Sequence, residues 1–348
     1  MRVGIVGAGL QAKRRAPILK AFPNTEIVVI SSEHLASAEA LARPLGCEAA
    51  VGWDWVAQRD DLDAILVCTP PHLHHAITLA AVTSGKHVLC EKPLARTLEE
   101  ATEMVAAAWA AKRVLKCGFN HRHHPGVIRA KHWVDQGNTG PLIFVRCRYG
   151  ICGRPGYEQE WRADPAIVGG GQLMEQGIHA IDLARMFLGD FQKVTGFVGT
   201  SYWQTGPLED NGFVLLQTAA GQMASIHASL TQWKNIFSLE VFGRDGYAVI
   251  EGLGGSYGNE RVMLGRRAFD APFAEEVVEF RGQDSSWKDE WREFASAIAE
   301  GREPLGSGAD GVEGIRLVLA AYEAAQRGVT VSLEPGRGAW EEHPAKRA

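Results

Sequence analysis

Three polar residues recur at helical spacing in the middle of the chain and are the first candidates for chemistry. Glu175, His179 and Asp182 are separated by four and three residues, so in a helix their side chains share one face. A histidine beside carboxylates can move a proton to or from a substrate. The same stripe is also typical of a solvated helix face, and from helical geometry alone both interpretations stand.

Lys92 is a candidate of a different kind. Most lysines are solvated, but this one stands between an apolar run, His87–Cys90, and Pro93. A lysine held in this way is partly buried and becomes a positioned hydrogen-bond donor. Its expected role is to hydrogen-bond a reacting hydroxyl and to stabilise the alkoxide that develops from it.

A glycine-rich turn lies close to the N-terminus. Gly7, Gly9, Leu10 and Gln11 follow the first apolar run and open a helical segment, with Ala12 at the third fingerprint position. Backbone N–H groups at such a helix start can face a pyrophosphate, and the glycines allow its close approach. Glycine turns also simply join strands to helices, but a position at the first strand-to-helix turn favours dinucleotide binding.

The end of the second predicted strand bears on the choice of cofactor. Ser32 can tolerate a 2′-phosphate, yet no arginine stands beside it, and the neighbouring Glu33 would repel a phosphate. These residues slightly favour NAD and leave NADP open. Alternatively, Ser32 and Glu33 only cap the following helix.

The first 120 residues alternate apolar runs with helical stretches, which is the pattern of parallel strands joined by crossover helices. Strands are expected at Val3–Val6, Ile27–Ile30, Ala64–Cys68, His87–Cys90 and Val114–Gly118. Helices are expected at Ala12–Ala21, Ala36–Ala42, His74–Ser84 and Leu98–Ala111. This order predicts a doubly wound sheet.

After Pro125 the pattern changes to strands that follow one another closely, as in an antiparallel sheet. These strands are expected at Leu142–Tyr149, Phe191–Ser201, Asn211–Leu216, Gln222–Leu230, Phe237–Phe242 and Tyr247–Glu251. Helices are expected at Gly126–Asp135, Gln172–Leu188, Trp287–Ala299 and Val312–Arg327, and Gly189 caps the second of them.

We therefore expect an α/β protein of two domains. Residues 1–120 form a dinucleotide-binding Rossmann domain with a doubly wound parallel sheet. Residues 121–335 form an α+β domain with a mostly antiparallel sheet, which binds substrate and pairs subunits. Residues 336–348, rich in charge and in Gly and Pro, form a frayed tail.

The composition excludes several classes of protein. A hydrophobic content of 46% with 22% charged residues is that of a packed globular chain. A formal net charge of -5 gives no basic footprint, so nucleic acid and membrane partners are disfavoured, and we expect a cytoplasmic protein. The six cysteines are dispersed and contain no Cys-x-x-Cys pair, so we expect reduced thiols and no metal site.

The segment from Gly85 to Pro93, which ends in Glu91-Lys92-Pro93, resembles the Glu-Lys-Pro signature of the Gfo/Idh/MocA oxidoreductases. That family is named for glucose-fructose oxidoreductase and inositol dehydrogenase. Further motifs in the family's order are Thr69–His74, Gly118–Arg122, Trp161–Pro165, Gly169–Gly171, His179 and Asp182. Agreement therefore extends over nearly the whole chain.

The resemblance implies which residues bind a nicotinamide cofactor. Those in the first domain are Gly7, Gly9, Leu10, Gln11, Ser32, Thr69, Pro70, His74, Glu91 and Lys92. Asn120 follows them, and Trp161 and Arg162 approach the nicotinamide end. Without the resemblance, Thr69 and Pro70 would be only a strand-ending turn, and Trp161 would more often be a core residue.

The resemblance also implies the catalytic residues. His179 occupies the position of the family's catalytic histidine, and Glu175 that of the usual aspartate four residues before it. The extra methylene of Glu175 moves its carboxylate by about an ångström, enough to change which substrate hydroxyl it holds. We expect His179 to take the hydroxyl proton while hydride passes to the nicotinamide and Lys92 holds the oxygen. The reverse reaction reduces a ketone, and the physiological direction stays open.

The substrate is expected to be polyhydroxylated, because aromatic and polar side chains suit a sugar-like ring. Besides Lys92, Glu175 and His179, the expected substrate contacts are Arg122, Tyr149, Tyr157, Glu158, Glu160 and Trp233. A sugar, a cyclitol, an aminosugar or aminoglycoside, and a sugar nucleotide all stay open. An aminoglycoside would connect the chain with antibiotic biosynthesis.

Two other kinds of protein resemble this family in sequence but differ in function. Some proteins like this family cleave glycosidic bonds through transient oxidation by tightly held NAD, and others are ligand-sensing regulators without catalysis. Retention of Lys92 and His179 argues against the second. Relatives of this family pair through the exposed face of the second sheet, so we expect a homodimer or homotetramer.

Overall fold

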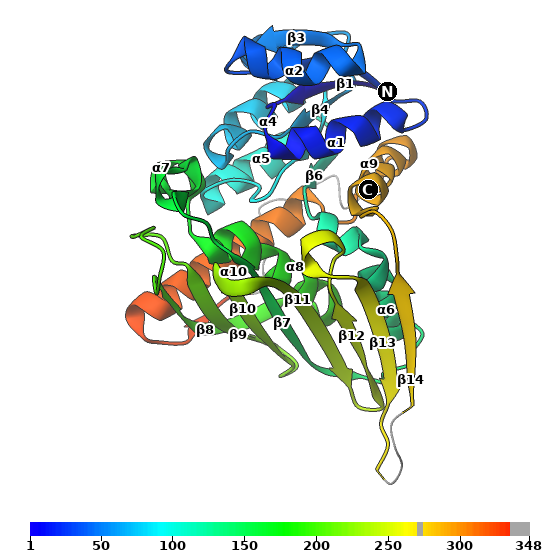
Figure 1. Ribbon diagram of the computed structural model, residues 1–348, viewed down its shortest axis with the longest axis vertical. Helices are drawn as coiled ribbons and strands as arrows, with labels where there is room; N and C mark the ends of the chain where they lie inside the picture. Colours follow the sequence, from blue (N-terminus) through cyan, green and yellow to red (C-terminus); the bar gives the residue numbers. More distant parts are fainter. Residues whose placement is uncertain (270–273, 335–348) are drawn as a thin grey trace. The chain divides into compact units, whose positions relative to one another are not determined.

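The computed structural model describes residues 1–269 and 274–334. It divides into two compact units, each built on its own sheet (Figure 1). Met1–Phe119 and Trp287–Ile315 form the first unit, and Asn120–Ser286 together with the described chain from Arg316 onward form the second. The predicted frayed tail at 336–348 lies outside the described residues.

The first unit contains a sheet of six strands in the order β3-β2-β1-β4-β5-β6, all paired in parallel. The strands are β1 (Arg2–Val6), β2 (Glu26–Ser32), β3 (Glu48–Val51), β4 (Ala64–Val67), β5 (His87–Cys90) and β6 (Leu115–Cys117). Helices between them are α1 (Leu10–Ala21), α2 (Leu35–Leu45), α3 (Asp54–Ala57), α4 (His74–Thr83) and α5 (Leu98–Ala110). The predicted doubly wound sheet is confirmed. We did not predict β3, because two of its four residues, Glu-Ala-Ala-Val, are alanines, which are depleted in strands.

A late segment of the chain completes the first unit rather than the second. Helix α9 (Ser286–Glu300) carries Trp291 and Phe294, which are fully buried in the same core as Ile5, Leu66 and Leu89. The predicted second domain, 121–335, therefore differs from the structure over Trp287–Ile315. Burial of two aromatic side chains stabilises this placement by several kcal/mol, roughly 1.5–3 for each. Nothing in the local helical pattern indicates which sheet such a helix covers.

The second unit contains a sheet of nine strands in the order β14-β13-β12-β11-β7-β10-β9-β8-β15. The strands are β7 (Leu142–Cys152), β8 (Phe191–Gly199), β9 (Asn211–Thr218), β10 (Met223–Ser229), β11 (Thr231–Gly243), β12 (Gly246–Glu251), β13 (Glu260–Arg266), β14 (Glu275–Phe280) and β15 (Val331–Ser332). Only β7 and β10 pair in parallel, so the predicted, mostly antiparallel sheet is confirmed. We did not predict β13, β14 or β15. The charged residues of β14, Glu-Glu-Val-Val-Glu-Phe, obscure the strand pattern.

One face of this sheet is covered and the other is open. Helices α6 (Pro125–Asp135) and α8 (Ile178–Leu188) pack on the sheet, and α10 (Gly308–Arg327) is the last helix. Along β7, Val145, Cys147 and Tyr149 are buried, whereas Arg146 and Arg148 between them are exposed. Because strand side chains alternate between faces, Tyr149 points to the covered face and Arg148 to the open one.

The predicted helix Gln172–Leu188 is not one regular helix. A π-helical turn, η5 (Leu173–Gly177), precedes α8, which ends at Gly189 as predicted. Backbone N–H groups of Gly171 and Leu173 donate to the Glu209 carboxylate at the start of this turn. The wider turn means that Glu175 and His179 do not follow the 3.6-residue period on which their shared face was predicted.

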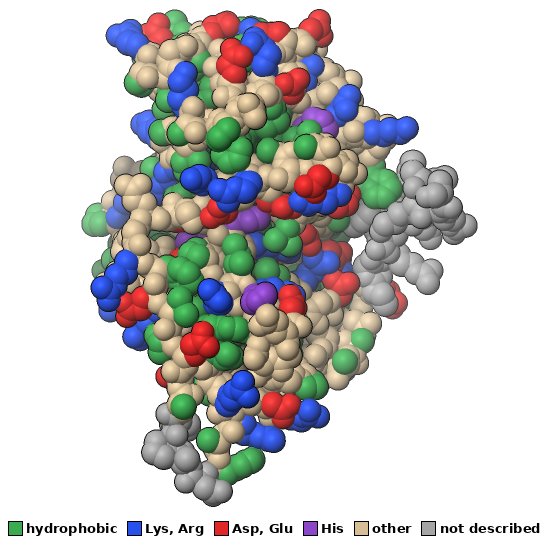
Figure 2. Space-filling model, turned by 90° about the vertical axis from the view of Figure 1, so that its right-hand side faces the viewer, with side chains coloured by type: hydrophobic (Ala, Val, Ile, Leu, Met, Phe, Trp, Pro, Cys, Tyr) green, Lys and Arg blue, Asp and Glu red, His purple; other side chains and the backbone are tan. Residues whose placement is uncertain are grey.

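On the face drawn in Figure 2, Lys and Arg side chains are intermixed with Asp and Glu side chains, so neither sign of charge dominates this face. This agrees with the formal net charge of -5. No helix in the described ranges is long and apolar enough to cross a lipid bilayer.

Candidate active site

The glycine turn between β1 and α1 has the geometry of a phosphate cradle. Gly7 has a φ of 101°, and a Cβ there would lie 2.6 Å from the carbonyl oxygen of Cys68. At Gly9, by contrast, a Cβ would have no neighbour within 4 Å. Helix α1 starts after Gly9 without a side-chain cap. The space beside Gly9 and the helix start without a side-chain cap suit the pyrophosphate of a dinucleotide.

The other predicted cofactor residues of the first unit gather at the carboxyl ends of its strands. Ser32 ends β2, Thr69 and Pro70 follow β4, and Glu91 and Lys92 follow β5. In doubly wound sheets this edge is where ligands bind.

Unsatisfied polar atoms support this assignment. Within 1–269 and 274–334, Thr69 Oγ1 and Gln11 Oε1 are buried and have no hydrogen-bond partner. A bound ligand that supplies partners removes the free-energy cost of such groups. The residues present thus fit a nicotinamide dinucleotide.

His74 joins the two loops that flank this edge. Its Nδ1 lies 2.9 Å from the carbonyl oxygen of Pro93 and its Nε2 2.9 Å from that of Thr69. Burial lowers the pKa of His74, with the two carbonyls acting in the opposite direction. The imidazole therefore ties the Thr69–Pro70 turn to the Glu91–Pro93 turn.

Lys92 is more exposed to solvent than its neighbours in the chain. From Val88 to Ala95 every residue is buried except Lys92, which is partly exposed. Lys92 lies two residues after Cys90, the last residue of β5.

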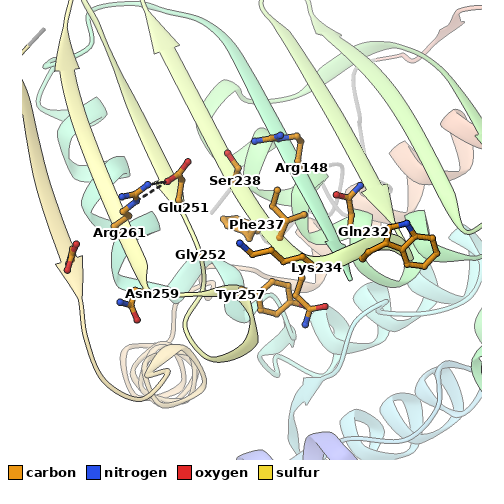
Figure 3. A pocket seen from close by; sticks show the side chains of 14 residues that line it. Arg148, Gln232, Lys234, Phe237, Ser238, Glu251, Gly252, Tyr257, Asn259 and Arg261 are labelled. Atoms are coloured by element: carbon orange, nitrogen blue, oxygen red, sulfur yellow. Dashed lines mark hydrogen bonds and ion pairs between the residues drawn. The ribbon is translucent and has the colours of Figure 1, made fainter. Parts of the chain in front are cut away.

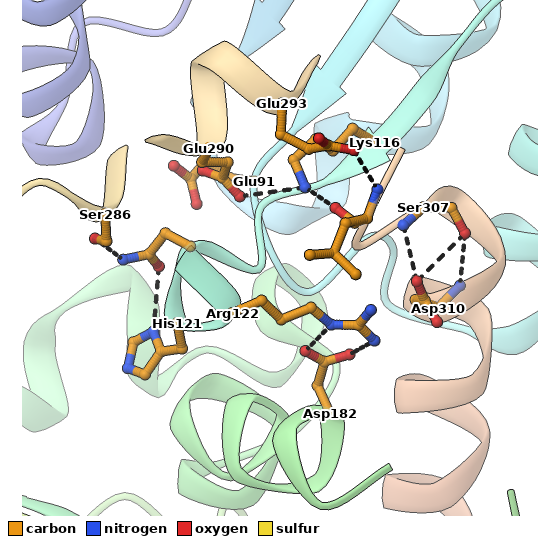
Figure 4. Close-up of polar contacts among 12 residues, drawn as sticks. Glu91, Lys116, His121, Arg122, Asp182, Ser286, Glu290, Glu293, Ser307 and Asp310 are labelled. Carbon is orange, nitrogen blue, oxygen red and sulfur yellow. Dashed lines mark hydrogen bonds and ion pairs between the residues drawn. The ribbon is translucent and has the colours of Figure 1, made fainter. Parts of the chain in front are cut away.

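A buried charge cluster behind Glu91 was not foreseen from the sequence. Arg15 Nε lies 2.6 Å from Glu91 Oε1, and Arg15 Nη1 lies 2.7 Å from Glu290 Oε2. Lys116 Nζ lies 3.8 Å from the second oxygen of Glu290 (Figure 4). Burial alone would lower the pKa of Arg15, but the two carboxylates outweigh it and raise that pKa. Arg15 follows Arg14 in a basic stretch, so the sequence gives no sign that one of them is buried.

His179 lies in the second unit on α8, with 4% of its surface exposed. Its ring is 6.4 Å from that of Tyr149 on the covered face of the sheet, measured between centroids. His121, from the 3-10 turn η2 (Asn120–His123), lies against it. The structure therefore brings together His179 and Tyr149, two of the predicted site residues.

Glu175 has partners of its own. Tyr157 donates its hydroxyl hydrogen to Glu175 Oε2 at 2.8 Å, and Arg162 Nε donates to Oε1 at 2.9 Å. Burial, and then the Glu175 carboxylate, raise the pKa of Tyr157. Arg162 also lies 3.5 Å from Glu160, measured between Nη1 and Oε2. Three predicted site residues, Glu175, Tyr157 and Arg162, thus form one hydrogen-bonded group.

Arg122 and Asp182 form a buried, bidentate ion pair, with N–O distances of 2.8 and 2.6 Å (Figure 4). Such a fork is among the stronger polar contacts in proteins. Arg122 was predicted to bind substrate, and the pair shows that its guanidinium already holds Asp182. Asn120, predicted to line the cofactor, donates to Ser286 Oγ at 2.9 Å.

Three predicted residues, Trp161, Glu158 and Trp233, differ in their surroundings. Trp161 is 37% exposed and carries the Arg162 guanidinium over its ring at 4.3 Å. Glu158 is exposed. Trp233 lines a hollow of about 690 Å³ together with Arg148 and Tyr257 (Figure 3). Glu175, Tyr157 and Arg162 are not among the residues that line this hollow.

No group of three His, Cys, Asp or Glu side chains suited to a metal occurs in the part of the chain that the structure describes. None of the six cysteines, all of which are described, takes part in a disulfide.

Two family descriptions match the two units. Residues 1–119 match the oxidoreductase family with an NAD-binding Rossmann fold, and residues 127–249 match the GFO/IDH/MocA C-terminal domain. The chain belongs to the Gfo/Idh/MocA oxidoreductases. The predicted family, the enzyme class and the nicotinamide cofactor are thereby confirmed, and the first unit is an NAD-binding domain.

Relatives of this Gfo/Idh/MocA oxidoreductase act on sugars. This chain is 32% identical to levoglucosan dehydrogenase of Pseudarthrobacter phenanthrenivorans. The match covers 64% of this chain and only 59% of that enzyme. It is 32% identical to dTDP-3,4-didehydro-2,6-dideoxy-alpha-D-glucose 3-reductase of Streptomyces antibioticus over 65% of this chain and 68% of that enzyme. The solved complex of levoglucosan dehydrogenase with NADH and levoglucosan superimposes with a TM-score of 0.87 at 26% identity, covering 96% of this chain and 99% of that one.

Proposed function

We propose that this protein is an NAD-dependent dehydrogenase or ketoreductase that acts on a secondary hydroxyl of an uncharged sugar or cyclitol. The observation that carries the proposal is Lys92, the one partly exposed residue in a buried run at the ligand-binding edge of an NAD-binding sheet. When bound, the nicotinamide accepts or supplies hydride. The residues of this chain have only to hold the substrate oxygen and to move its proton.

Lys92 is the residue that holds the reacting oxygen in this proposal. Its ammonium group donates a hydrogen bond to the hydroxyl and stabilises negative charge on that oxygen as the proton leaves. His179 is the general base and takes the proton in the direction of oxidation. In reduction the same imidazole returns it.

The second unit favours a substrate without a positive charge. The carboxylates beside the predicted substrate residues already have cationic partners, Glu175 with Arg162 and Asp182 with Arg122. An ammonium group of an aminosugar would have to compete with these pairs. A neutral ring with hydroxyls needs only hydrogen bonds, which the Glu175 group can give and accept.

Two of the relatives support this substrate class, whereas the relative from Streptomyces antibioticus acts on a negatively charged dTDP-sugar. Solved complexes of levoglucosan dehydrogenase contain levoglucosan or L-sorbose, both uncharged. Inositol 2-dehydrogenase of Rhizobium meliloti, 26% identical over 96% of this chain and 99% of that enzyme, adds a cyclitol.

The proposal is tested by absorbance at the reduced-nicotinamide band. NAD and NADP are each offered with levoglucosan, L-sorbose, myo-inositol, an aminoglycoside and a dTDP-sugar. The expected result is reduction of NAD with one of the first three. Turnover of the aminoglycoside alone overturns the substrate class. Binding of the cofactor with neither reduction of NAD nor oxidation of NADH by the ketose L-sorbose overturns the activity. Glycoside cleavage with no net reduction identifies the NAD-dependent hydrolase instead.

The open face of the second sheet supports self-association. Phe197 on β8, Phe213 and Leu215 on β9, and Met223 on β10 are all more than half exposed, at 80%, 54%, 55% and 53%. Exposed apolar side chains on neighbouring strands are typical of an interface. A homodimer or homotetramer formed through this face is expected in light scattering, and Phe213→Glu should dissociate it. A monomer of the unaltered chain at micromolar concentration would contradict this part of the proposal.

A further inference from the structure

A second histidine is stacked on His179. The ring centroids of His121 and His179 are 3.9 Å apart and their planes differ by 23°. Both side chains are almost fully buried, at 6% and 4% exposure, and both belong to the second unit. At this separation the two imidazoles are in van der Waals contact over their faces.

The His121 ring is held by groups other than His179. Asn120 Nδ2 donates to Ser286 Oγ at 2.9 Å, which turns Asn120 Oδ1 toward His121 Nδ1 at 3.2 Å. Because this oxygen can only accept, His121 carries its hydrogen on Nδ1. The dashed lines of Figure 4 follow this chain from Ser286 to His121.

Aromatic rings enclose His121 on its remaining sides. The ring of Tyr149 lies 5.1 Å away and that of Phe237 6.0 Å away, both from the covered face of the sheet. His124 meets His121 edge-on, with centroids 5.5 Å apart, and Glu260 holds His124 at 3.0 Å. Contacts from β7 and β11, and from β13 through His124, thus restrain His121 without involving His179.

We infer that His121 is a positioning residue that fixes the plane of the His179 imidazole. The nitrogen lone pair of a histidine lies in the plane of its ring, so a proton can be taken only from a donor near that plane. A flat, immobile neighbour at 3.9 Å removes rotation of the ring out of this plane. The lone pair of His179 is then aimed before substrate binds, which is the geometric part of general-base catalysis.

This inference rests on the proposed role of His179 as the base. The family resemblance assigns no role to His121, and the sequence places it 58 positions from His179. Only the fold brings the two rings together.

The test compares His121→Phe, which keeps a flat ring, with His121→Leu, which keeps apolar bulk without one. We expect His121→Phe to retain kcat within about threefold and His121→Leu to lose about tenfold or more. In both variants KM and the Kd for NAD should stay within about twofold. Loss of packing alone would instead lower the melting temperature without this kcat difference. His121→Gln replaces the leucine variant if that variant does not fold.

Two further measurements separate this inference from the proposed function. In a His179→Ala background, His121→Leu should cause no additional loss of turnover. In the full-length protein labelled with ¹³C-histidine, the ring resonances of His179 should show a ring-current shift that His121→Leu reduces to the contribution of Tyr149 and His121→Phe keeps. If His179→Ala is inactive but His121→Leu keeps full kcat, His121 has no positioning role. If His179→Ala itself retains turnover, the proposed function fails, while the ring-current shift still reports whether the rings stack.

Discussion

Replacement of Arg15 by methionine should destabilise the protein far more than the same change at its neighbour Arg14. Arg15 is 1% exposed and contacts two carboxylates, Glu91 at 2.6 Å and Glu290 at 2.7 Å. Methionine fills much of the volume but leaves Glu91 without its cation. Arg14, one position earlier on α1, is exposed, and its guanidinium lies over the Trp287 ring at 5.3 Å.

The expected magnitudes follow from burial. Removal of one partner from a buried ion pair costs about 3–5 kcal/mol, because the remaining charge stays buried without compensation. In a unit of this size each kcal/mol corresponds to roughly 2–4 °C in melting temperature, so Arg15→Met should lower it by about 10 °C. Arg14→Met loses an exposed cation–π contact and should cost about 1 kcal/mol or less.

The loss of stability caused by Arg15→Met should depend on pH. Burial already raises the pKa of Glu290, and Arg15 is the largest contribution that lowers it, so loss of Arg15 raises that pKa further above its value in the unfolded chain. A group whose folded-state pKa is raised contributes stability at low pH and loses it as pH rises. The deficit of Arg15→Met should therefore be smaller at pH 5.5 than at pH 8. Thermal unfolding followed by circular dichroism measures this, and equal melting temperatures for both variants, or a deficit unchanged with pH, would refute the reasoning.

Two further predictions concern the phosphate loop and the Glu175 group. Gly7→Ala places a Cβ 2.6 Å from a backbone carbonyl oxygen and should weaken NAD binding, measured by calorimetry, at least tenfold. The control is Gly46→Ala, where φ is 68° and a Cβ has no neighbour within 4 Å. This variant should leave NAD binding unchanged. Glu175→Gln removes the charge that Arg162 and Tyr157 contact, so KM for the sugar should rise about fivefold or more with the Kd for NAD unaltered. Tyr157→Phe removes one hydrogen bond and should raise KM less; a larger effect than that of Glu175→Gln would contradict this account of the group.

The parallel sheet and its phosphate loop were predictable because their signals are local. Apolar runs such as Val3–Val6 and the glycines after them lie within a few residues of one another. We did not predict β3 and β14, because alanine or glutamate occupies positions where large apolar residues would indicate a strand. The π-turn before α8 leaves the apolar pattern of Gln172–Leu188 intact, so it could not be seen in the sequence.

The residues of the candidate site could be predicted from the sequence, but the ion pairs that they form could not. Arg122 and Asp182 are 60 positions apart, and nothing near either indicates that they form a bidentate pair. Arg15 and Glu290 are joined only because α9 returns to the first unit. Such pairs depend on tertiary packing, which local patterns do not encode.

The central claim is that Lys92 and His179 act directly on the reacting hydroxyl. Its most direct test measures NADH formation at saturating substrate for Lys92→Met, His179→Ala and the unaltered chain, with the Kd for NAD determined in parallel by fluorescence. We expect each variant to lose at least about a hundredfold in kcat while its Kd for NAD stays within about threefold. Near-normal kcat in both variants, with NAD bound as tightly as before, would contradict the account.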